Sequence, residues 1–85
     1  MRNLETYVER INAFSAIFGQ RALDINNAAD RQRIADKIDG DLSPENLTCD
    51  GELSAAQVRS RYKLLTAAAR ELKALDPNVT FYEVV

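Results

Sequence analysis

The clearest pattern of chemically active side chains in this chain is a row of cations between residues 55 and 75. Arg59, Lys63, Thr66, Arg70 and Lys73 are spaced four, three, four and three residues apart, and on an α-helix they fall within an arc of about 80°. This basic stripe could bind an acidic protein surface or nucleic acid, or it could be the solvated outer face of a helix. Nucleic acid is the weaker candidate, because the formal net charge of the chain is −2.

Residue types that usually carry catalysis are scarce. Histidine, the commonest general base and metal ligand, is absent. The single cysteine, Cys49, lies beside Asp50 and Glu52, and acidic neighbours disfavour a reactive thiolate. Glu5 and Glu9 lie one helical turn apart, and we interpret them as solvated carboxylates. With no Gly-rich phosphate loop and no nucleophile–base pair, we expect neither enzymatic activity nor a cofactor.

Residues 46–57 resemble a calcium-binding EF-hand loop, with Gly51 at the sixth position. Asn46 replaces the first aspartate of that pattern and Gln57 replaces its bidentate twelfth glutamate, so charge is missing where calcium most needs it. A turn followed by a helix cap already explains these residues. We therefore expect no metal at this loop, and a calcium titration would decide whether any affinity remains.

Apolar periodicity predicts three helices that would position these residues. The apolar face of the first is formed by Leu4, Tyr7, Val8, Ile11, Phe14 and Phe18. Ala22 and Ile25 keep the same phase, so this helix is expected to run past Gly19 to about Asp24, with Asn26-Asn27 as the following break and N-cap. Its aromatic residues could form a ligand platform, but core packing is the favoured interpretation.

The second helix is expected at about residues 28–39, with Ile34, Ala35 and Ile38 as core contacts and Gly40 as its C-terminal stop. After it, Ser43-Pro44-Glu45 has the order N-cap, N1 proline and early acid, which predicts a single short helical turn.

The third helix is expected at residues 55–75, opened by the capping box of Ser54 and Gln57 and stopped at Asp76-Pro77. Its predicted core rows are Val58, Leu65 and Leu72, then Ala68 and Leu75, then Tyr62 and Ala69. We expect the first and third helices to make the main contact. The predicted fold is an all-α, small three-helix bundle at residues 1–77 with a C-terminal extended arm at residues 78–85, together forming a single domain.

Arg61 is unusual because its position on the helix falls within the apolar face. We expect its aliphatic stem to lie along the core while the guanidinium reaches water. In the alternative, Arg61 pairs with an acid from residues 39–52 or from another chain, since a buried charge without a partner is costly.

The C-terminal residues 78–85 are β-prone, yet the chain offers no second good strand. They could lie over the bundle as a strap, with Phe81 in the core. They could also pair with the same tail of a second subunit or add a strand to a partner's sheet. We interpret the tail as partnerless within its own chain, which favours a homodimer.

Three segments near the C-terminus, residues 46–53, 61–72 and 75–77, resemble short proteins encoded by tailed phages and prophages. The resemblance covers about the last 40 residues. It implies an accessory phage protein that acts on a host or phage component, and it supplies no active site.

The sequence as a whole favours a non-enzymatic protein–protein interaction module with an unknown protein partner, and a homo-oligomer is expected because an 85-residue chain has a thin core. The alternative is a nucleic-acid-binding regulator. No apolar run is long enough for a membrane helix, so we expect a cytoplasmic protein. The candidate binding residues are Arg59, Arg61, Lys63, Arg70, Lys73, Val79, Phe81 and Tyr82.

Overall fold

The computed structural model describes residues 2–82, which contain four helices and no strand. The helices are α1 (Arg2–Ile17), α2 (Ala28–Leu42), α3 (Pro44–Leu47) and α4 (Ala55–Leu75). The prediction of an all-α fold is confirmed for this part of the chain. The last three residues of the predicted arm, 83–85, lie outside the described residues.

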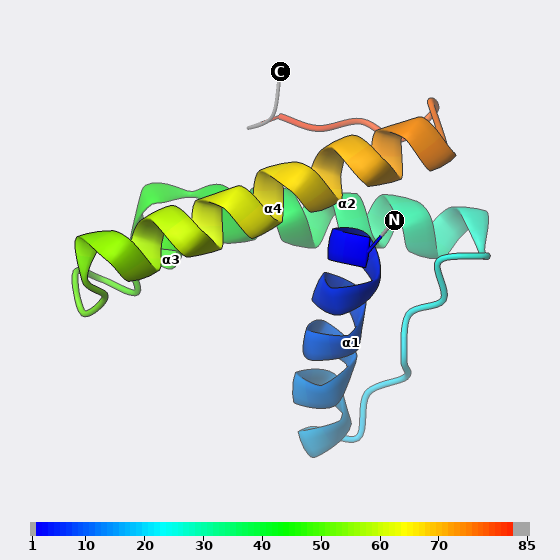
Figure 1. Ribbon diagram of the computed structural model, residues 1–85. Coiled ribbons are helices and arrows are strands. Elements are labelled where there is room, and N and C mark those ends of the chain that lie inside the picture. Colours follow the sequence, from blue (N-terminus) through cyan, green and yellow to red (C-terminus); the bar gives the residue numbers. More distant parts are fainter. Residues whose placement is uncertain (1, 83–85) are drawn as a thin grey trace.

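Helices α2 and α4 pack against each other, and α1 crosses them with only its N-terminal half in contact (Figure 1). The most extensive helix–helix contact joins α1 and α4, as predicted. The core is formed by Leu4, Tyr7, Val8, Ile34, Ala35, Ile38, Leu42, Leu65, Ala68, Ala69, Leu72 and Val79. The alanines of α4 let the neighbouring helices approach closely. None of the helices within residues 2–82 combines the length and the apolar composition needed to cross a bilayer.

Helix α1 ends at Ile17, so the prediction that it continues to about Asp24 was wrong. Gly19 adopts a left-handed conformation with φ of 69°. The Gln20 N–H donates to the Ser15 carbonyl at 3.1 Å, and the Gly19 N–H donates to Ala16 at 3.1 Å. These are the two bonds of a Schellman motif, in which glycine satisfies the last carbonyls of a helix. The chain therefore leaves the helix although the apolar phase continues.

A buried carboxylate anchors the segment that returns from α1 to α2. The Asp30 side chain is fully buried and accepts hydrogen bonds from Arg21, at 2.8 Å to each oxygen, and from Arg33 at 2.9 Å. The Asp24 N–H donates to it as well, at 3.0 Å. The hydrogen bonds from Arg21 are the main reason why the pKa of Asp30 lies well below its usual range. This cluster could not be predicted from the sequence, because nothing local marks Asp30 as buried.

Helix α2 begins where predicted, since the side chain of Asn27 accepts from the Asp30 N–H as an N-cap. It continues through Gly40 to Leu42, so the prediction of a stop at Gly40 was wrong. Leu42 is buried in the core, and the residue before Pro44 is extended, with φ −60° and ψ 146° at Ser43. Proline rather than glycine therefore ends α2, and α3 is the short turn expected after it.

Helix α4 has the predicted bounds. The Ser54 N–H donates to the Gln57 side chain at 2.8 Å, and the Gln57 N–H donates back to the Ser54 hydroxyl at 3.2 Å. The helix ends before Asp76-Pro77. Both signals are local in sequence, which is why they could be interpreted correctly.

Candidate functional site

The basic stripe of α4 borders a shallow groove of about 650 Å³ on the outer side of the helix. The groove is lined by Leu47, Val58, Arg59, Tyr62, Lys63, Thr66 and Arg70. Tyr62 was expected in the core, but it is 53% exposed because α1 and α2 pack against other sides of α4. Helix α3 brings Leu47 to the groove, a contribution that the sequence did not reveal. We call this surface the α4 groove.

The cations of the α4 groove are not neutralised locally. Arg59, Lys63 and Arg70 are exposed, and none of their charged groups makes an ion pair or hydrogen bond with another residue of the described range. Glu71, on the same helix, is turned toward α1, where it accepts from the Leu4 N–H at 3.0 Å. The groove thus combines an apolar floor with positive walls.

Lys73 and the C-terminal residues do not belong to this groove. The Lys73 ammonium donates to the Val79 carbonyl, and Val79 is only 2% exposed. The Gln32 side chain both donates to the Thr80 carbonyl, at 3.1 Å, and accepts from the Thr80 N–H, at 3.0 Å. The Tyr82 N–H donates to Asp39 at 2.9 Å. Residues 78–82 thus lie along the helices as a strap (Figure 1).

The interpretation of the tail as partnerless therefore fails for residues 79–82. Backbone groups of Val79, Thr80 and Tyr82 bond to side chains of α2 and α4, which a search for a second strand could not reveal. Val79, rather than Phe81, is the deeply buried residue, while Phe81 is partly buried and Tyr82 is exposed. Val79 is therefore a core residue and not an accessible binding residue.

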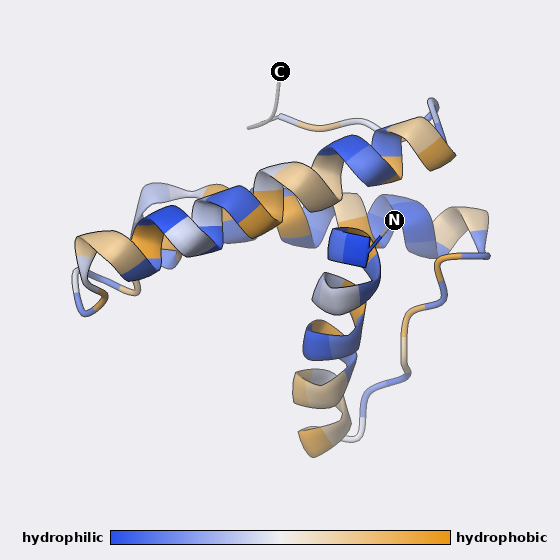
Figure 2. Ribbon diagram, in the orientation of Figure 1, coloured by the Kyte–Doolittle hydropathy of each residue, from blue (hydrophilic) through white to orange (hydrophobic). Residues whose placement is uncertain are grey.

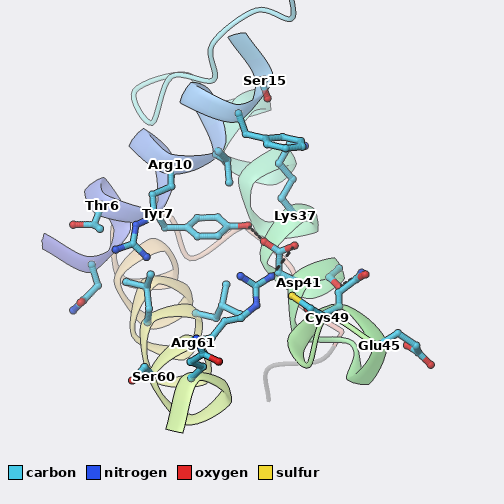
Figure 3. Close-up of a pocket in the computed structure, with 18 of the residues that line it drawn as sticks. Thr6, Tyr7, Arg10, Ser15, Lys37, Asp41, Glu45, Cys49, Ser60 and Arg61 are labelled. Carbon is cyan, nitrogen blue, oxygen red and sulfur yellow. Dashed lines mark hydrogen bonds and ion pairs between the residues drawn. The ribbon is translucent and has the colours of Figure 1, made fainter. Parts of the chain in front are cut away.

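Of the two arrangements considered for Arg61, the structure has the second, in which Arg61 pairs with an acid of residues 39–52. It lies in the cleft lined by α1, α2, α3 and α4, where its guanidinium is 3.8 Å from the Asp41 carboxylate (Figure 3). The Tyr7 hydroxyl donates to the same carboxylate at 2.7 Å. Burial, reinforced by this bond, raises the pKa of Tyr7 far above its usual value, so the phenol stays protonated. The three side chains tie α1, α2 and α4 together, while the Arg61 Nε is buried without a hydrogen-bond partner.

The loop that resembles an EF-hand uses its end residues for other contacts. The Asn46 side chain donates to the Gly40 carbonyl at 2.7 Å, and Gln57 belongs to the capping box of α4. Cys49 and Asp50 have positive φ, so the turn is shaped by its backbone. Residues 2–82 contain no group of three or more acidic or cysteine side chains placed to hold a metal ion.

The C-terminal end of α1 is an exposed apolar surface, which contradicts the prediction that Phe14 and Phe18 pack in the core. Phe14 is 65% exposed, Ile17 76% and Phe18 64%, and this end projects beyond the other helices (Figure 2). The two rings lie 5.2 Å apart between centroids. The phase of the apolar residues was interpreted correctly, but only Ile11 of its second half packs against the core, while Phe14 and Phe18 stay exposed.

No known family model, curated protein or solved structure matches this chain. The function must therefore be argued from its surfaces.

Proposed function

We propose that this chain is a small, non-enzymatic, cytoplasmic interaction module whose α4 groove binds an acidic segment of a partner protein. The observation that carries the proposal is the pairing of an apolar floor, formed by Leu47, Val58 and Tyr62, with three cations that lack local partners. As the resemblance to tailed-phage proteins implies, the partner would be a host or phage component.

A protein partner accounts for the groove better than nucleic acid does. Its Tyr62 ring and aliphatic floor suit an apolar side chain, and aromatic residues beside cations are typical of protein interface centres. The chain as a whole is acidic, with a net charge of −2. This charge opposes a long phosphate backbone, which extends beyond the groove, more than a short acidic segment that contacts only the groove. The expected ligand is therefore an amphipathic segment that places acids beside Lys63 and Arg70 and an apolar side chain against Tyr62.

The test uses a fluorescein-labelled peptide of alternating glutamate and leucine, followed by fluorescence anisotropy. The wild-type chain should bind it, and a peptide with serine in place of leucine should bind at least about tenfold more weakly, a difference of about 1.4 kcal/mol. Lys63→Glu should weaken binding by a similar factor, because it places a negative charge on the groove wall.

The matched control is Lys37→Glu, which makes the same charge change at an exposed position of α2, outside the groove. The proposal is contradicted if Lys37→Glu weakens binding as much as Lys63→Glu. It is also contradicted if a DNA duplex binds the chain with a steep salt dependence while the peptide does not bind.

A further inference from the structure

We infer that the projecting end of α1 is a dimerisation surface and that its occupant is the same end of a second copy, packed antiparallel about a twofold axis. The surface consists of Phe14, Ile17 and Phe18, with Ile11 and Arg10 beside them, and we call it the α1 tip. A homodimer was expected from the tail, but the tail is bound within its own chain over residues 79–82. Within the described residues, the α1 tip is a second surface, besides the α4 groove, that lacks a partner.

The helical phase of the α1 tip shows that it needs a neighbouring helix. Ile11, Phe14 and Phe18 continue the stripe of Leu4 and Tyr7, which packs into the core through the first half of α1. Ile11 still packs against the core, but beyond it Phe14 is 65% and Phe18 64% exposed, at the end of α1 that projects from the other helices (Figure 2). An apolar stripe of this width is typical of a helix that faces another helix.

The area of the α1 tip fits a weak dimer contact rather than an obligate one. With roughly 200 Å² for a large apolar residue, the exposed fractions of Phe14, Ile17 and Phe18 leave about 400 Å² uncovered. A patch of this size is among the largest on a typical monomer. Two tips bring together about 800 Å² of apolar surface, and flanking residues such as Arg10 and Ala13 raise the total toward the ~1,200 Å² at which specific interfaces begin.

The tip is self-complementary in an antiparallel arrangement, as a twofold contact requires. If Phe14 lies opposite Phe14 of the second copy, Ile11 lies opposite Ile17 and Arg10 lies opposite Phe18. No like charges meet, and the Arg10 guanidinium approaches an aromatic ring. Glu5 and Glu9 lie on the far side of the helix, at about 140° to 180° from the centre of the stripe. A second copy therefore supplies each group on the tip with a suitable neighbour.

The experiment measures the solution mass of the full chain by light scattering, at concentrations up to about 1 mM, where even a weak dimer is populated. We expect twice the chain mass of 9.5 kDa. Phe14→Asp should return the mass to that of one chain with unchanged helical circular dichroism, because Phe14 is exposed in the isolated subunit. Ala16→Asp is the matched control on the opposite side of the same helix, and it should remain dimeric.

A second measurement uses oxidation of a cysteine variant in a Cys49→Ser background. Phe14→Cys should form a disulfide-linked dimer, whereas Ala16→Cys should not, because its Cβ points away from the twofold axis. A monomer at all concentrations overturns the inference, as does a Phe14→Asp variant that keeps the dimer mass or equal crosslinking of both cysteines. No residue of the α4 groove belongs to α1, so failure here and failure of peptide binding are separate results.

Discussion

Replacing Val79 by alanine tests whether the C-terminal strap is part of the core. Val79 is 2% exposed and packs in the same cluster as Leu72 and Ile34. The substitution removes two methyl groups worth about 0.8 kcal/mol each and leaves a cavity, so the free energy of unfolding should fall by about 2–3 kcal/mol. The backbone bonds of Val79 and Thr80 remain possible in the variant, so the change isolates the side chain.

Urea unfolding followed by circular dichroism measures this loss. For a domain of this size, 2–3 kcal/mol corresponds to a melting temperature lower by about 10–20 °C. Tyr82→Ala is the control, because Tyr82 is 83% exposed and its side chain should contribute less than about 0.5 kcal/mol. If Val79→Ala loses no more than this control, the strap does not stabilise the fold and the assignment of Val79 to the core is wrong.

Four further substitutions test the turns, caps and buried charge. Because the pKa of Asp30 is lowered in the folded chain, its stabilising contribution is present above the unfolded pKa of about 4 and is lost as the pH falls below it. Asp30→Asn should therefore lower stability at pH 7 and flatten the acid dependence of urea unfolding; an unchanged acid slope would contradict this. Gly19→Ala should cost about 1 kcal/mol because of its φ of 69°, whereas Gly40→Ala, inside α2 with open space around it, should stabilise by about 0.5–1 kcal/mol; equal effects in thermal melts would refute the difference. Ser54→Ala should cost about 1 kcal/mol, and a melting temperature unchanged from wild type would contradict the capping box.

For the strap and the α1 tip, the structure is the opposite of what the sequence predicts. The strap was expected to lack a partner and is bound, whereas the rings of the tip were expected in the core and are exposed. A β-prone tail without a second strand indicates an open edge, but Gln32 supplies both a donor and an acceptor to Thr80 from 48 residues away. Conversely, the phase of Phe14 and Phe18 indicates which side of α1 is apolar. It does not indicate whether the chain has another element to place there.

Sequence alone determined what depends on neighbouring residues. The bounds of α4, its capping box, the N-cap at Asn27 and the turn at Pro44 follow from hydrogen bonds and steric limits within a few positions. The basic stripe was equally visible, because helical spacing places its members on one side.

Tertiary structure alone decided which side chains of separate segments contact one another. It holds the segment between α1 and α2 in place through Asp30 and Arg21, and it pairs Arg61 with Asp41. It also brings Leu47 beside Tyr62 to form the floor of the α4 groove. Each of these contacts joins residues distant in the chain, and their formation depends on how whole helices pack, a cooperative outcome that no local pattern of residue types contains.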